Sequence, residues 1–95
     1  MAEVRLSAVA LEDLDRLILT HSLPTDTRAR VKRSLRALER FPLLGRELQG
    51  RWGSFRFILG PWRWLLIVYV YDEHEDVVLI ATIQDARSSS AATSG

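Results

Sequence analysis

Apolar and polar residues alternate first with the period of a strand and then with that of a helix. A short strand is predicted over residues 3–6, where apolar and charged side chains alternate. Ser7 is typical of a helix N-cap, so a helix is predicted from about Ala8 to His21. One face of this helix carries an apolar stripe formed by Ala10, Leu14, Leu17, Ile18 and His21.

A second helix follows the break at Ser22–Pro24. Thr25 or Asp26 can cap its start, and Pro42 ends it near Phe41. The buried face is predicted to contain Val31, Leu35 and Leu38, and the outer face Arg28, Lys32, Arg33, Arg36 and Arg40. Because only a short turn separates the two helices, we expect them to pack as an antiparallel hairpin.

Three strands are predicted in the second half of the chain, over residues 54–59, 62–71 and 77–84. Gly60-Pro61 and the acidic loop 72–76 separate them, and a glycine-containing connection over 43–53 precedes them. The predicted fold is α+β, with the N-terminal strand and the helical hairpin packed on one face of a small, mainly antiparallel sheet. We expect a single domain over residues 1–87 and a flexible polar tail over 88–95.

Tight turns would place three arginines on one face of this sheet. If Leu59 lies opposite Trp62 and Tyr71 opposite Val77, then Arg56, Arg63 and Arg87 converge on the face away from the helices. The face that meets the helices is then predicted to carry Phe55, Phe57, Leu59, Trp62, Trp64, Leu66, Val68 and Val70. This prediction assumes a two-residue turn at Gly60-Pro61, because a shift of the strand register by one residue moves every side chain to the other face.

Charge is distributed unevenly, although the formal net charge is only +1. Residues 28–63 contain ten basic residues against two acidic ones, and residues 72–95 contain five acidic residues against one basic. Lys32 is the only lysine, and arginine favours bidentate contacts with phosphate or carboxylate. The basic half therefore indicates a polyanionic target or an acidic partner, although a solvated helix face explains the cations of 28–40 equally well.

The glycine-rich connection contains residues suited to binding a nucleic acid or another target. Arg46 and Arg51 supply charge, and Trp52 can stack on a base or contact a partner, or simply pack over the sheet edge. No spacing of His, Asp or Glu predicts a metal site, and no cofactor is expected. Cysteine is absent and the longest apolar run is too short to cross a bilayer, so a soluble cytoplasmic protein without membrane contact is expected.

Four segments resemble the RelE/ParE toxin family in the order in which that family has them. Val4-x-Leu6-Ser7 with Ala10 and Asp13-Leu14 is similar to the family's first strand and helix. The segment 41–48 resembles its linker, and residues 54–63 its strand pair with two spaced arginines. Residues 83–87 resemble the last strand, which ends in an arginine.

The resemblance implies a toxin of a bacterial type II toxin–antitoxin system, neutralised by a cognate antitoxin. In the RelE-like branch the toxin enters the ribosome and cleaves mRNA, and Arg56, Arg63 and Arg87 would then clamp the phosphate as the catalytic residues. In the ParE-like branch it inhibits DNA gyrase and performs no chemistry. Ribosome-dependent cleavage is the slightly preferred prediction, although Arg46, Arg51 and Arg56 stand where lysines would serve proton transfer better. A small RNA- or protein-binding module without toxicity is a further alternative.

Overall fold

The computed structural model describes residues 1–88 and 90–93, which form two α-helices and one five-stranded sheet. The sheet order is β1-β5-β4-β3-β2. β1 is parallel to β5, and the other neighbouring strands are antiparallel. The predicted α+β class and mainly antiparallel sheet are confirmed. The strands are β1 Glu3–Leu6, β2 Arg46–Glu47, β3 Arg56–Leu59, β4 Leu65–Asp72 and β5 Val77–Asp85.

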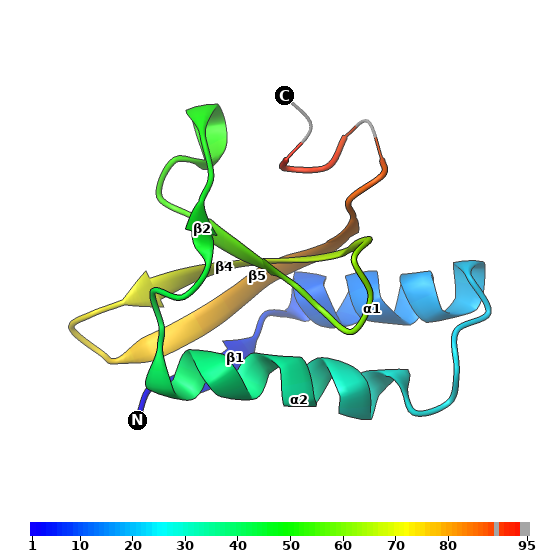
Figure 1. Ribbon diagram of the computed structural model, residues 1–95, viewed down its shortest axis with the longest axis horizontal. Helices are drawn as coiled ribbons and strands as arrows, with labels where there is room; N and C mark the ends of the chain where they lie inside the picture. Colours follow the sequence, from blue (N-terminus) through cyan, green and yellow to red (C-terminus); the bar gives the residue numbers. More distant parts are fainter. Residues whose placement is uncertain (89, 94–95) are drawn as a thin grey trace.

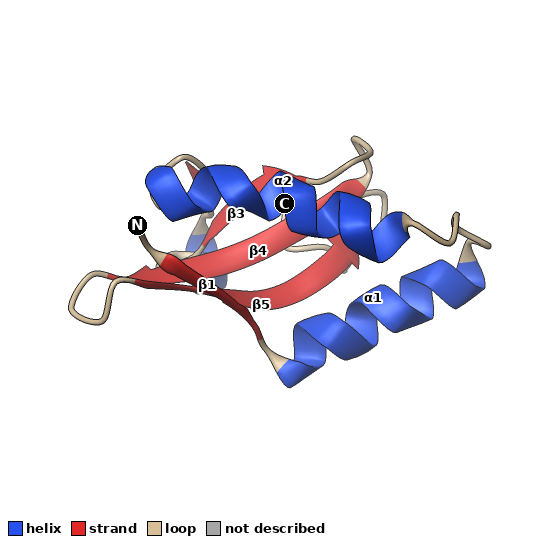
Figure 2. Ribbon diagram, turned by 90° about the horizontal axis from the view of Figure 1, so that it is seen from below, coloured by secondary structure: helices blue, strands red, loops and turns tan. Residues whose placement is uncertain are grey.

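Both helices lie on the same face of the sheet (Figure 2). Helix α1 spans Ala8–Thr20, and its N-cap Ser7 accepts a hydrogen bond from the Ala10 N–H at 3.0 Å, as predicted. Helix α2 spans Thr27–Arg40 and ends at Phe41. Asp26 occupies the N-cap position of α2, but its carboxylate accepts from Arg30 Nε instead of capping the helix.

The main core lies between the helices and the sheet. Val31, Leu35 and Leu38 of α2 are buried there, as the sequence predicted. They pack in one cluster with alternate residues of the central strand β4, namely Leu65, Ile67 and Tyr69. All residues from Leu65 to Tyr69 have no exposed surface, which is expected of a central strand covered on both faces.

A second, smaller core covers the opposite face of the sheet. Leu66 and Val68 of β4 pack there with Leu48 and Ala91, and with five partly buried residues, Trp52, Phe55, Phe57, Ala86 and Ala92. Figure 1 shows the linker after α2 (residues 41–53) and the C-terminal segment standing above the sheet, while the helices lie below it. The sequence predicts a flexible polar tail over residues 88–95. Among its described residues, Ala91 is buried and the Ala92 N–H donates to Gln84 Oε1 at 2.7 Å. Ser89, Ser94 and Gly95 of this tail lie outside the described residues.

The turn between β3 and β4 is longer than predicted. Leu59 lies opposite Leu66, not Trp62, so five residues separate the strands. The Gly60 N–H donates to the Leu65 carbonyl, and the Leu65 N–H donates to the Trp62 carbonyl. Between β4 and β5, Tyr71 lies opposite Val78 and not Val77, and the register shifts again at Val68/Tyr69.

The predicted assignment of the two sheet faces is wrong. Phe55, Phe57, Leu66 and Val68 do share a face, but this face meets the linker and the C-terminal segment instead of the helices. The face carrying Ile58 and Tyr69 meets the helices. Trp64 departs from the alternation and packs against the helix-side core, and Leu59 remains 46% exposed.

Candidate functional site

Arg46, Arg51 and Trp52, which the sequence suggested as target-binding residues, line one groove. The groove has a volume of about 830 Å³ and lies between the linker and the C-terminal segment. Arg46 belongs to the edge strand β2, and the other two residues belong to the short 3-10 helix η1, Gly50–Trp52. Its lining consists of residues 46–52, Phe57 and residues 90–93.

The two arginines of the groove are exposed, and Trp52 is half-buried. The edge of the Trp52 indole packs against Phe55 in a T-shaped arrangement with ring centroids 5.6 Å apart. Neither Arg46 nor Arg51 makes an ion pair within the described residues. The groove therefore presents two arginines without an ion pair, together with Glu47 and an anchored aromatic ring, a combination that suits an anionic or aromatic target.

The sheet holds the linker in place through Tyr69. This tyrosine has no exposed surface, and its hydroxyl donates to the Pro42 carbonyl at 2.7 Å and accepts from the Gly45 N–H at 2.8 Å. Burial raises the pKa of the Tyr69 hydroxyl, which the Gly45 hydrogen bond and the Arg56 charge partly oppose. The hydroxyl is thus neutral and able to donate. Glycine is needed at position 45 because a Cβ there would lie 2.6 Å from the Phe57 carbonyl oxygen.

Arg56 forms the second attachment of the linker. Its guanidinium donates to the Gly45 carbonyl at 2.8 Å, to the Leu43 carbonyl at 3.4 Å and to Glu47 Oε1 at 3.0 Å. Only 23% of its side chain is exposed. Both Nη atoms of Arg56 are therefore bonded to the linker, so this predicted catalytic residue supports the fold of the groove edge.

Arg63 and Arg87 lie at a different place from Arg56. Arg56 lies opposite Tyr69 of β4, and Asp85, two residues before Arg87, lies opposite Leu65. The backbone positions of Arg56 and Asp85 are therefore about 13 Å apart along β4. Arg63 belongs to the turn before β4, and Arg87 follows β5. The Ala86 N–H donates to the Trp64 carbonyl at 2.7 Å, which brings the segments carrying Arg63 and Arg87 side by side. The two pairings on which the predicted convergence rested are not formed, since Leu59 lies opposite Leu66 and Tyr71 opposite Val78. A phosphate clamp of the three arginines stays a prediction.

Arg87 is already bonded to a carboxylate. Its Nε and Nη2 donate to the two oxygens of Asp85, each at 2.9 Å, and its guanidinium lies over the Trp64 ring at 4.9 Å. The hydrogen bonds from Arg87 are the main reason why the pKa of Asp85 is well below its ordinary value. A phosphate bound here would compete with Asp85. Arg63 is exposed and makes no hydrogen bond or ion pair with another described residue.

His21 has two partners that the sequence did not predict, Trp64 and Asp85. Its imidazole stacks on Trp64 with centroids 4.9 Å apart, and Nε2 lies 3.2 Å from Asp85 Oδ2. Trp62 stacks in turn on Trp64. His21 Nδ1 is buried and has no hydrogen-bond partner, and the stacked ring packs the end of α1 onto the sheet. The signal was present in the sequence, because His21 continues the apolar stripe of the first helix.

The part of the chain that the structure describes holds neither a candidate metal site nor a helix able to span a membrane. No group of three or more His, Asp or Glu side chains is placed to hold a metal ion among residues 1–88 and 90–93. Neither helix there is long and apolar enough to cross a membrane.

Comparisons with known proteins agree with this architecture. Residues 4–89 match the family model described as the ParE toxin of type II toxin–antitoxin system, parDE. No curated protein matches the chain. Among solved structures, the RelBE2 toxin–antitoxin complex from Mycobacterium tuberculosis has a TM-score of 0.66 and 23% identity, covering 88% of this chain and 96% of that one.

Two further solved structures come from E. coli. The isolated RelE toxin has a TM-score of 0.66 and 17% identity, with 95% of this chain and 89% of that chain covered. The intact RelBE toxin–antitoxin complex has a TM-score of 0.60 and 16% identity, with 93% and 100% covered. At these identities the likeness concerns the fold.

Proposed function

The chain belongs to the ParE toxin family of type II toxin–antitoxin systems, and we propose that it is a toxin that acts by binding its target in the groove, without chemistry of its own. Its neutralising partner is a cognate antitoxin, as in the RelBE complexes whose toxins share this fold. By resemblance to the ParE-like branch, the target is DNA gyrase, and the compartment is the cytoplasm.

One observation carries the proposal of a binding mechanism. Arg46, Arg51 and Trp52 gather in one groove, and its two arginines make no ion pair with other described residues. Cleavage of RNA requires cations for the phosphate and groups for proton transfer within one constellation. Arg56 is instead committed to the linker, and Arg87 to Asp85. Binding needs only the surface that the groove provides.

Ribosome-dependent mRNA cleavage is a second candidate, because Arg63 and Arg87 lie in adjacent segments at one end of the sheet. Asp85 bonds to Arg87, and His21 in turn contacts Asp85. His21 directs Nε2 at Asp85, and its Nδ1 is buried, so neither nitrogen is placed to take a proton from a substrate. For this reason we propose target binding, and not RNA cleavage, as the mechanism.

Induced expression of the chain alone tests both candidates. We expect growth arrest with filamentation and a DNA-damage response, and we expect R46E/R51E to abolish it. K32E/R33E is a control with the same change in charge, because both residues are exposed on α2 away from the groove. Loss of translation with mRNA cut within codons, abolished by R63A/R87A and not by R46E/R51E, would replace this proposal with the cleavage mechanism.

A further inference from the structure

We propose that an acidic polypeptide segment carrying apolar side chains docks at the carboxyl end of α2. The surface, called here the α2-end patch, consists of Phe41, Leu43 and Leu44 together with Arg36 and Arg40. This inference rests on the proposed function, because the partner is the neutralising antitoxin. It adds where that partner binds and which side chains recognise it.

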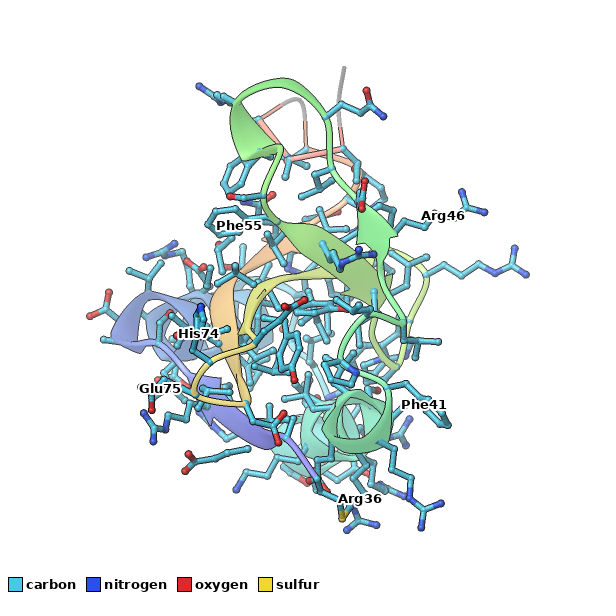
Figure 3. All side chains as sticks on the ribbon, turned by 90° about the vertical axis from the view of Figure 1, so that its left-hand side faces the viewer. Arg36, Phe41, Arg46, Phe55, His74 and Glu75 are labelled. Atoms are coloured by element: carbon cyan, nitrogen blue, oxygen red, sulfur yellow. The ribbon has the colours of Figure 1, made fainter. Side chains whose placement is uncertain are left out.

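The apolar part of the α2-end patch is exposed to solvent. Phe41 is 61% exposed, Leu43 52% and Leu44 56%. The three residues lie within four positions of the chain, and the Leu44 N–H donates to the Phe41 carbonyl at 3.0 Å, which folds this segment into a turn. Phe41 and Arg46 project from the same side of the molecule in Figure 3. Clustered exposed apolar side chains of this size are typical of a protein interaction surface.

The backbone that carries these side chains is fixed. Tyr69 binds the Pro42 carbonyl and the Gly45 N–H, and Arg56 binds the carbonyls of Leu43 and Gly45. Phe41, Leu43 and Leu44 are therefore presented on a backbone held from the sheet. A partner would not need to order this segment, which lowers the cost of binding.

The charge beside the patch indicates an acidic partner. Arg33, Arg36 and Arg40 recur along α2 at spacings of three and four, so they line one side of the helix. They are exposed, and none of them makes an ion pair with a described residue. A second copy of this chain would bring the same cations against each other. A nucleic acid would pair with the arginines but leave the apolar side chains in water.

The test measures affinity for a defined probe, the purified product of the reading frame adjacent to this gene. F41S/L44S is the variant, and L11S/L19S is the matched control, since Leu11 and Leu19 are 51% and 82% exposed on α1. We expect F41S/L44S to lose affinity on the order of tenfold or more, and L11S/L19S to bind as the wild type does. Thermal unfolding of both variants checks that the fold is kept.

The outcomes separate this inference from the proposed function. F41S/L44S should remain toxic when expressed alone and should no longer be rescued by co-expression of the probe. Equal affinity of F41S/L44S and the wild type, or no binding by the wild type, overturns the α2-end patch. The α2-end patch is also overturned if the probe does not bind and an RNA or DNA duplex binds in a way that depends on Arg36 and Arg40. If the wild-type chain is not toxic when expressed alone, the proposed function is overturned but the α2-end patch is not, because the affinity for the probe is measured in a separate experiment.

Discussion

Tyr69 is the residue that connects the core to the functional surface. It lies in the middle of the central strand without exposed surface, yet its hydroxyl reaches two backbone groups of the linker. A buried backbone N–H without a partner is costly, so the Gly45 N–H depends on this hydroxyl. The close approach also excludes any side chain at position 45, where a Cβ would lie 2.8 Å from the Tyr69 ring.

Removal of this hydroxyl should therefore destabilise the fold. We expect Tyr69→Phe to lower the free energy of unfolding by about 1–3 kcal/mol, because the buried Gly45 N–H and the Pro42 carbonyl both lose their partner. Urea denaturation followed by circular dichroism measures this change. Tyr71→Phe is the control, since the Tyr71 hydroxyl bonds to Asp76 at an exposed site. Equal, small effects of the two substitutions would contradict the role assigned to Tyr69.

At the scale of elements, the sequence predicted both helices and four of the five strands, β1, β3, β4 and β5, but not how the strands align. Ser7, Pro42 and the apolar spacings are local signals, and they set the helix boundaries correctly. The β3–β4 register depends on the length of a turn. Gly60-Pro61 indicated a two-residue turn, whereas the turn continues through Trp64. The ring of Trp64 stacks on His21. Tertiary packing of one side chain thus overrode a local turn signal.

The faces of the sheet were not predictable from pattern alone. β4 is apolar at every position from Leu65 to Val70, so both of its faces are suited to burial. The strand pairings assumed for the three-arginine face differ from the observed ones for this reason together with the length of the turn. Arg46, Arg51 and Trp52 line one groove because they lie within seven residues of one linker, and closeness in sequence needs no register. Their role in target binding stays a prediction.

The C-terminal segment should contribute to stability as an element of the second core. Ala91 is 5% exposed and packs in the cluster with Leu66 and Val68. We expect Ala91→Asp to lower the melting temperature by several degrees, because it places a carboxylate in an apolar site. Differential scanning calorimetry measures the shift, with Thr93→Asp as the exposed control in the same segment. An unchanged melting temperature for Ala91→Asp would mean that this segment does not hold the sheet face.

At the scale of the whole molecule, one linker carries both proposed surfaces. Residues 41–44 belong to the α2-end patch beside the helices, and residues 46–52 line the groove on the opposite face of the sheet. Arg46 is only two residues beyond Leu44 in the sequence. A partner docked at the patch would therefore lie close to the mouth of the groove, which gives a physical route from antitoxin binding to neutralisation.

The two surfaces should nevertheless be separable by charge reversal. R46E/R51E and R36E/R40E lower the formal net charge by the same amount, so an effect of the overall electrostatic field on partner binding would be equal for both. We expect R36E/R40E to weaken binding of the adjacent gene's product on the order of tenfold, because acidic side chains of the partner would meet repulsion at the patch. R46E/R51E should bind it nearly as the wild type does while being non-toxic. Isothermal titration calorimetry at two salt concentrations measures both affinities. Equal weakening by the two variants would show that the partner responds to net charge and not to the α2-end patch.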